Sequence, residues 1–229
     1  MSHSRLENDV IDKGAAARWA AVQELAAPAV PGGLERVSDP TRDTKPDDAP
    51  QTSLREVMAQ FATGVTVITA GGEHGHGMTA NAFTSVSLAP PLVLCCVART
   101  ARMHRAIQSA GSFAVSVLSG GQEALARYFA DRQRPLGPAQ FNSVDWVAGR
   151  WTGAPLLSGA LAWLECALVK SYDGGDHTIF LGSVLSTHCG VQGEALLFFS
   201  GSFSSCRLYA ARDPTDRDGA VVAPSRPPV

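Results

Sequence analysis

The sequence predicts a mainly β protein built as a closed or partly closed antiparallel barrel with a few flanking helices. Between residues 52 and 210 most apolar runs are β-branched or alternate with polar residues over the length of a strand. These runs do not alternate regularly with helical patterns, and no G-x-G-x-x-G motif follows a strand. A Rossmann domain is therefore disfavoured.

Composition and charge narrow the class of partner. The chain has 229 residues, of which 45% are hydrophobic and 17% charged, with a formal net charge of -2. Such a chain lacks the basic footprint of a nucleic-acid-binding protein. Neither a membrane-spanning run nor a signal peptide is present, so we expect a cytoplasmic protein that binds no membrane. Five cysteines without a C-x-x-C pair indicate neither a disulfide framework nor a zinc knuckle.

The chain divides into three parts. Residues 1–50 are rich in proline and charge and predict a mobile extension, within which 15–27 has the composition of a short helix. Residues 51–210 form the folded domain. Residues 211–229 predict a flexible C-terminal tail.

The first half of the domain should begin with a helix. Ser53 and Glu56 have the spacing of a capping box, an apolar face follows, and Gly64 ends the helix. The next segments have strand-like composition and follow one another as an antiparallel meander. The expected strands are 65–70, 78–88 and 91–98, with a turn at 71–77.

The second half mixes short helices with longer strands. Thr100 can cap a helix over 102–110, and a further helix is expected at 121–130. A loop with two prolines and a glycine follows it. The expected strands are 112–118, 160–173, 177–189 and 195–203.

Residues 78–88 carry the first candidate binding surface. As one strand, their side chains alternate between two faces, so a neutral polar ladder with one aromatic ring lies on one side. Such a ladder suits a flat heteroaromatic ligand with donors and acceptors along its rim. The alternative is an ordinary solvent-facing strand. The ladder consists of Thr79, Asn81, Phe83, Ser85 and Ser87.

A basic segment at 99–107 is the second candidate. Its positive side chains gather near the predicted helix N-terminus, where backbone N–H groups favour a phosphate. The alternative is a surface helix with solvated arginines. The basic residues are Arg99, Arg102, His104 and Arg105.

Histidines mark two turns. The corner Gly174-Gly175-Asp176-His177 precedes a strand, and its glycines let the backbone approach a flat ring closely. The alternative for His177 is a turn histidine bonded to backbone. His74 and His76 lie beside Glu73 in the other turn, where we expect solvated side chains and no metal site.

Six segments in order resemble the short-chain flavin reductases, the reductase components of two-component flavin-dependent monooxygenases. They extend from about Leu54 to Leu208: FATGVTVIT, GMTANAFTSVSLAPPLVL, SFAVSVLSGGQEALARYFA, GALAWLECAL, DGGDHTIFLG and LLFFSGSF.

The resemblance implies an FMN-binding split β-barrel of Greek-key-like order that forms a homodimer. It implies an NAD(P)H:flavin oxidoreductase, in which NADH or NADPH gives a hydride to FMN or FAD. The reduced flavin would pass to a transient oxygenase partner.

The resemblance also assigns binding residues. The flavin ring and ribityl chain would lie along residues 81–85 of the expected strand 78–88, with Thr79 beside them. The flavin phosphate would lie near the start of the expected helix 102–110, with Thr100 nearby. The nicotinamide would lie at the glycine corner 174–177. His177 would act in catalysis, by hydrogen-bonding nicotinamide or stabilising charge on reduced flavin, with Asp176 setting its tautomer. The assigned residues are Thr79, Asn81, Ala82, Phe83, Thr84, Ser85, Thr100, Ala101, Arg102, Met103, Gly175, Asp176 and His177.

Three positions depart from the family pattern. Family members often have hydroxyl residues where Ala82, Ala101 and Met103 stand, so some contacts to ribityl and phosphate oxygens are absent. Two alternatives follow: a flavin-binding protein of this fold without reductase turnover, and a split-barrel enzyme with its own flavin-dependent oxidation chemistry.

Overall fold

The computed structural model of the chain describes residues 52–73 and 75–206. The helix expected at 15–27 and the terminal segments 1–50 and 211–229 lie outside these residues, as does His74. No helix in the described part is long and apolar enough to cross a membrane.

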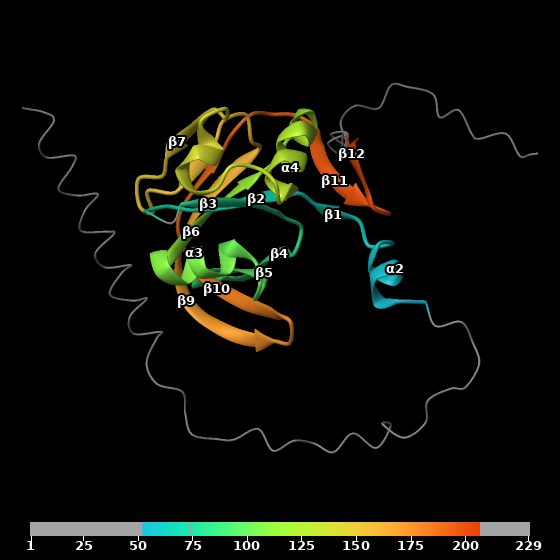
Figure 1. Ribbon diagram of the computed structural model, residues 1–229, viewed down its shortest axis with the longest axis horizontal. Helices are drawn as coiled ribbons and strands as arrows, with labels where there is room; N and C mark the ends of the chain where they lie inside the picture. Colours follow the sequence, from blue (N-terminus) through green and yellow to red (C-terminus); the bar gives the residue numbers. More distant parts are fainter. Residues whose placement is uncertain (1–51, 74, 207–229) are drawn as a thin grey trace, which may run out of the picture.

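Within the described residues, seven strands form one antiparallel sheet that curls into the body of the molecule (Figure 1). Their order across the sheet is β3-β2-β6-β9-β10-β5-β4. Several neighbours are far apart in the chain, as Greek-key-like connections require, and the predicted fold class is confirmed. The strands are β2 (Thr66–Ala70), β3 (His76–Ala80), β4 (Phe83–Leu88), β5 (Pro91–Ala98), β6 (Ser112–Val117), β9 (Ala162–Gly174) and β10 (His177–Cys189).

The sheet is nearly closed because β3 and β4 are consecutive in the chain but lie at its opposite edges. Only Asn81 and Ala82 separate them, and three residue steps span at most about 11 Å. We call this junction the seam. The prediction of one strand over 78–88 was therefore wrong: the chain leaves one edge at Ala80 and joins the other edge at Phe83, with Cys96 N–H donating to the Ala82 carbonyl.

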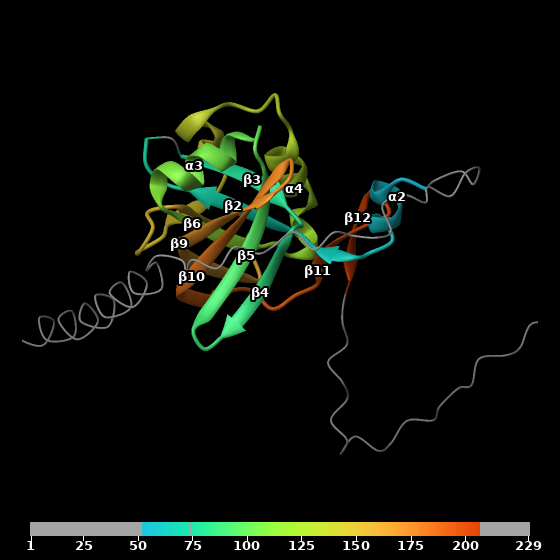
Figure 2. The same cartoon turned by 90° about the horizontal axis from the view of Figure 1, so that it is seen from below.

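A second, smaller sheet lies to one side of the barrel with the first helix (Figures 1 and 2). The predicted strand at 195–203 was wrong, because Ser200 and Gly201 have φ values of 47° and 77° and make a hairpin turn. The capping box of Ser53 and Glu56 is confirmed. The elements are α2 (Leu54–Met58), β1 (Thr63–Gly64), β11 (Ala195–Phe199) and β12 (Ser202–Cys206); an unpredicted hairpin, β7 (Trp146–Ala148) and β8 (Pro155–Leu157), forms a third sheet.

Both faces of β2 are buried, each under a different helix. Ile68 belongs to a core cluster with Met103 and Ile107 of α3 (Arg102–Ala110). Val67, on the other face, belongs to a cluster with Phe129 of α4 (Glu123–Ala130). These two helices are thereby held beside the seam; the short 3₁₀ turns η1 (Gly120–Gln122) and η2 (Gly137–Phe141) flank α4.

Candidate functional site

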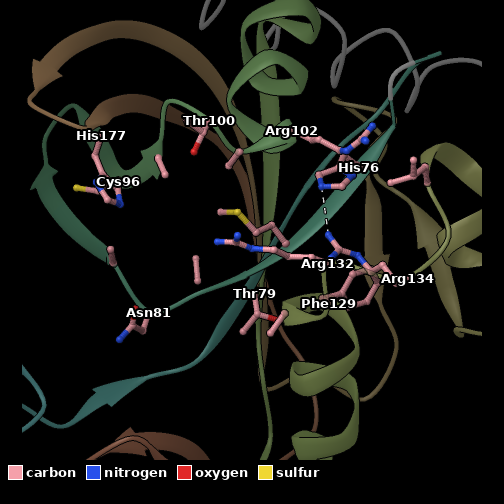
Figure 3. A pocket seen from close by; sticks show the side chains of 17 residues that line it. His76, Thr79, Asn81, Cys96, Thr100, Arg102, Phe129, Arg132, Arg134 and His177 are labelled. Atoms are coloured by element: carbon pink, nitrogen blue, oxygen red, sulfur yellow. Dashed lines mark hydrogen bonds between the residues drawn. The ribbon is translucent and has the colours of Figure 1, made fainter. Parts of the chain in front are cut away.

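A cavity of about 670 Å³, here the seam cavity, opens beside the junction of β3 and β4 (Figure 3). Its walls come from β3, the seam, the end of β5, the start of α3, the end of α4 and the segment that follows it. The fold thus brings together residues from distant parts of the chain. The predicted binding residues that line it are Thr79, Asn81, Ala82, Thr100, Ala101, Arg102 and His177.

The other predicted residues lie elsewhere. Phe83 and Thr84 line a neighbouring groove, and Ser85 is exposed on β4. The Met103 side chain is fully buried in the core, so it does not face the cavity. Gly175 and Asp176 form the turn behind His177. Because β3 and β4 are separate strands, the ladder predicted over 79–87 does not form one continuous face.

Small side chains form part of the wall of the seam cavity. Ala80, Ala82, Ala98 and Ala101 contribute no atoms beyond Cβ to its wall. The Asn81 side chain stands at the edge of this surface (Figure 3), while the Thr79 hydroxyl already donates to the Ala126 carbonyl at 2.6 Å. The cavity can therefore admit a flat ring close to the backbone.

The start of α3 faces the same space. The predicted cap was Thr100, but the N-cap is Ala101, which has no side-chain hydrogen bond to the helix. The first backbone N–H groups of α3 thus lack a side-chain acceptor, and the helix dipole adds partial positive charge there. Such an end suits an anionic group.

Three arginines make the same side of the cavity basic (Figure 3). Arg102 comes from α3, while Arg132 and Arg134 come from the segment after α4. Within the described residues neither Arg102 nor Arg132 has a carboxylate partner, so both remain able to pair with a ligand phosphate. Sequence reasoning missed Arg132 and Arg134; the basic run directly after the helix predicted at 121–130 was the available signal.

His76 is part of the wall rather than a solvated turn residue, so that prediction was wrong. It begins β3, is 7% exposed, and its Nε2 lies 3.1 Å from Nη2 of Arg134. Its Nδ1 lies 3.2 Å from Nε2 of the buried Gln140. Burial and the two nearby arginines, Arg134 and Arg102, lower the pKa of His76 to about 4. The imidazole is therefore neutral at pH 7.

No group of three or more His, Cys, Asp or Glu in the described ranges is arranged to hold a metal ion. The absence of a metal from the chemistry stays a prediction.

His177 enters the cavity from the turn between β9 and β10. Its Nδ1 lies 2.8 Å from Oδ1 of Asp176. A carboxylate only accepts, so the proton sits on Nδ1 and Nε2 is the nitrogen left for a ligand. This hydrogen bond in turn lowers the pKa of Asp176. Gly175, with φ of 78°, makes the tight turn that presents the ring.

A larger groove of about 1020 Å³ adjoins the seam cavity and shares Asn81, Ala82 and Cys96 with it. We call it the apolar groove. Phe61, Phe83 and other apolar side chains line it. Its wall also contains Thr63, whose Oγ1 is a buried polar atom without a partner in the described part of the chain. Burying such an atom is costly unless an occupant of the groove pairs with it.

The sequence and structure were compared with known proteins. A family described as flavin reductase like domain matches residues 58–207. An NADH-dependent FAD reductase of Streptomyces globisporus is 53% identical over 167 residues, which cover 73% of this chain and 91% of that protein. The reductase component of 4-hydroxyphenylacetate 3-monooxygenase from Thermus thermophilus is 40% identical over 152 residues, covering 66% and 93%.

Solved structures agree with the sequence matches. An NADH:FAD oxidoreductase of Streptomyces globisporus, in complex with NAD and FAD fragments, superposes with a TM-score of 0.62 at 52% identity. The match covers 72% of this chain and 93% of that one.

Replacing His76 with glutamine should remove part of the acid sensitivity of the fold. As the pH falls below about 6.5, the unfolded chain gains a proton on His76 that the native chain does not accept until about pH 4. The free energy of unfolding of the wild type therefore falls by about 3 kcal/mol over this window from His76 alone. Urea denaturation at pH 7 and pH 4 measures the difference; equal losses in both proteins would contradict the assignment.

Proposed function

The chain belongs to the flavin reductase like domain family, and we propose that its seam cavity binds a flavin and a nicotinamide dinucleotide next to each other. The chain is a nicotinamide-dependent flavin reductase: NADH or NADPH gives a hydride to FMN or FAD, and the reduced flavin serves a partner monooxygenase. We further propose NADH and FAD as its pair, as the Streptomyces globisporus relative is named for both.

The residues of the seam cavity fit such ligands. The alanines provide a flat wall for a ring, and the bare N-terminus of α3 with Arg102 and Arg132 provides charge for phosphates. His177 lies in the same cavity. The presence of an alanine wall, a basic end and the His177 imidazole held by Asp176 in a single cavity is the observation that carries the proposal.

The bound flavin would supply the hydride acceptor, and the protein's contribution is orientation. No Asp or Glu of the described chain lines the seam cavity, so strong acid–base chemistry is not built into it. The Asp176 carboxylate keeps the proton of His177 on Nδ1. Nε2 can then accept from the carboxamide of nicotinamide, or, once protonated, donate to negative charge on a reduced ring.

Two of the three departures from the family pattern are compatible with a phosphate at the start of α3. Met103 is buried, so its side chain is not positioned to contact a phosphate. Ala101 leaves the N–H groups of the first turn without a side-chain competitor. The accessory role without turnover, which rested on these positions and Ala82, loses much of its support.

We propose a homodimer that buries the apolar groove and the outer face of α2. Leu54, Val57, Met58 and Phe61 are exposed there, and all five described residues of α2 remain unburied. The groove is contiguous with the seam cavity through three shared residues. A second copy would cover this apolar surface and supply a partner for the Thr63 hydroxyl.

The purified protein should oxidise NADH when FAD is in excess, followed at the nicotinamide absorbance band. His177→Ala should lower kcat/KM for NADH by roughly tenfold, because Nε2 is lost from the nicotinamide side of the cavity.

His188→Ala is the matched control for that variant, since His188 lies at the far end of β10 and is exposed. It should stay within about twofold of wild type. A fall of less than about threefold for His177→Ala would show that His177 does not have this role.

Arg102→Met should distinguish flavins by their phosphates. A hydrogen bond to a charged group contributes about 1.5 to 3 kcal/mol, so the KM for FAD or FMN should rise about ten- to a hundredfold. The KM for riboflavin, which has no phosphate, should stay the same. Equal effects on riboflavin and FAD would place the phosphate elsewhere.

Sedimentation equilibrium should give twice the 24.0 kDa chain mass for wild type. Phe61→Glu places a charge in the groove wall and should give the monomer, because the interface cannot pair it. Val147→Glu, at 62% exposure against 65% for Phe61, is the matched control on strand β7, outside the groove, and should remain dimeric. A monomeric wild type would contradict the proposal.

A further inference from the structure

Arg99 lies directly after β5, and three of its groups contact the turn that carries His177. Its Nη2 forms an ion pair with Oδ1 of Asp173 at 2.7 Å, and its Nε donates to the Gly175 carbonyl at 2.9 Å. Its backbone N–H donates to the Asp176 carbonyl at 3.0 Å. One residue therefore contacts Asp173 near the end of β9 and both residues of the turn, Gly175 and Asp176.

The residues that Arg99 contacts also form hydrogen bonds with one another and with His177. Oδ1 of Asp173 also accepts from the Gly175 N–H at 2.9 Å, so the same oxygen joins the arginine to the turn backbone. Asp176, whose carbonyl Arg99 contacts, uses its side chain to hold Nδ1 of His177. The chain of contacts thus runs from Arg99 through the turn to the ring in the cavity.

We call the contacts of Arg99 with Asp173, Gly175 and Asp176 the clamp. Its exposed location argues against a mainly structural role. The side chains of Arg99 and Asp173 are 48% and 78% exposed, and ion pairs at such positions contribute little to stability. The strands on both sides are already held by the β5–β10 and β9–β10 ladders, whose registers reach His177. Those ladders pair His177 with Ala98 and Gly174, so only Gly175 and Asp176 lie outside them. These are the two residues whose carbonyls Arg99 contacts, and the Asp176 side chain orients the His177 ring.

We propose that Arg99 is a positioning residue for the reductase reaction, which fixes the turn at 173–177 so that His177 presents Nε2 to the nicotinamide side of the seam cavity. Arg99 follows the strand that ends at Ala98 and precedes Thr100 and Ala101 of the cavity wall. It therefore links the phosphate side of the cavity to the nicotinamide side. This inference rests on the proposed function, because it assigns Arg99 a task only through His177.

The test compares Arg99→Met, which keeps the aliphatic stem and removes the guanidinium, with Arg99→Lys. Arg99→Met should lower kcat/KM for NADH at least fivefold and leave the KM for FAD within twofold. Arg99→Lys restores a charge for Asp173 but not the planar fork that also reaches the Gly175 carbonyl, so it should recover activity only in part.

Arg127→Met is the matched control, because Arg127 forms an ion pair of the same 2.7 Å length with Glu123 on α4, away from the seam cavity. Its kcat/KM should equal that of wild type, and both methionine variants should show similar thermal unfolding midpoints.

A second measurement does not depend on activity. Nitrogen-15 NMR of the labelled histidine rings reports which ring nitrogen of His177 carries the proton. The wild type should show the Nδ1–H tautomer, and Arg99→Met should shift the ring towards the Nε2–H form. A tautomer shift without a change in kcat/KM would support the clamp and count against the role proposed for His177. An unchanged tautomer in Arg99→Met would overturn the clamp, whatever the kinetics show.

Discussion

The junction of β3 and β4 constrains the rest of the molecule. Two residues must carry the chain from one edge of a seven-stranded sheet to the other, so the sheet can only be curled and nearly closed. The two edge strands do not pair along their length there, and the barrel stays split at this point. The gap lets a ring approach the backbone, and the elements that surround it, α3, the end of α4 and the β9–β10 turn, all contribute to the seam cavity.

Polar groups around this gap divide into those already paired and those left for a ligand. Gln140, which is fully buried, accepts from the Gly77 N–H at 2.9 Å and donates to the Gly137 carbonyl at 2.7 Å, so it fixes the segment after α4 onto β3. Arg134 bonds the Gly77 carbonyl and His76. Arg102 and Arg132 have no such protein partners in the described part. Fixed polar groups thus shape the wall, while free ones provide its charge.

Much of the fold could be predicted from local sequence, because β-branched and alternating runs indicate where strands form. The expected strands at 91–98 and 177–189 match β5 and β10, and the capping box of Ser53 begins α2. The break at Asn81 could not be predicted in the same way. Alternation continues through 78–88 without a glycine or proline, and only the closure of the sheet, a long-range constraint, divides the segment.

The site was predicted unevenly for the same reason. His177 and Arg102 lie on motifs that are continuous in sequence. Arg132 and Arg134 reach the cavity through long-range packing of α4 and the segment after it on β3, where a Cβ at Gly77 would lie 2.5 Å from the Phe129 ring. The glycine-rich turn sequence around His76 predicts a solvated side chain, yet the ring is buried and contacts Gln140, 64 residues away. The positions of Arg132, Arg134 and His76 in the cavity wall therefore depend on tertiary packing, which local sequence does not reveal.

The wall shared by the seam cavity and the apolar groove has a thermodynamic consequence. Asn81, Ala82 and Cys96 face both spaces, so an occupant of one alters the surface met by the occupant of the other. Where an occupant of one space moves these three residues, the two binding free energies are coupled, and such coupling is reciprocal: the factor by which the groove's occupant changes ligand affinity is the factor by which the ligand changes the affinity of that occupant. If a second copy fills the groove, ligand affinity becomes a function of protein concentration, and dilution weakens both together.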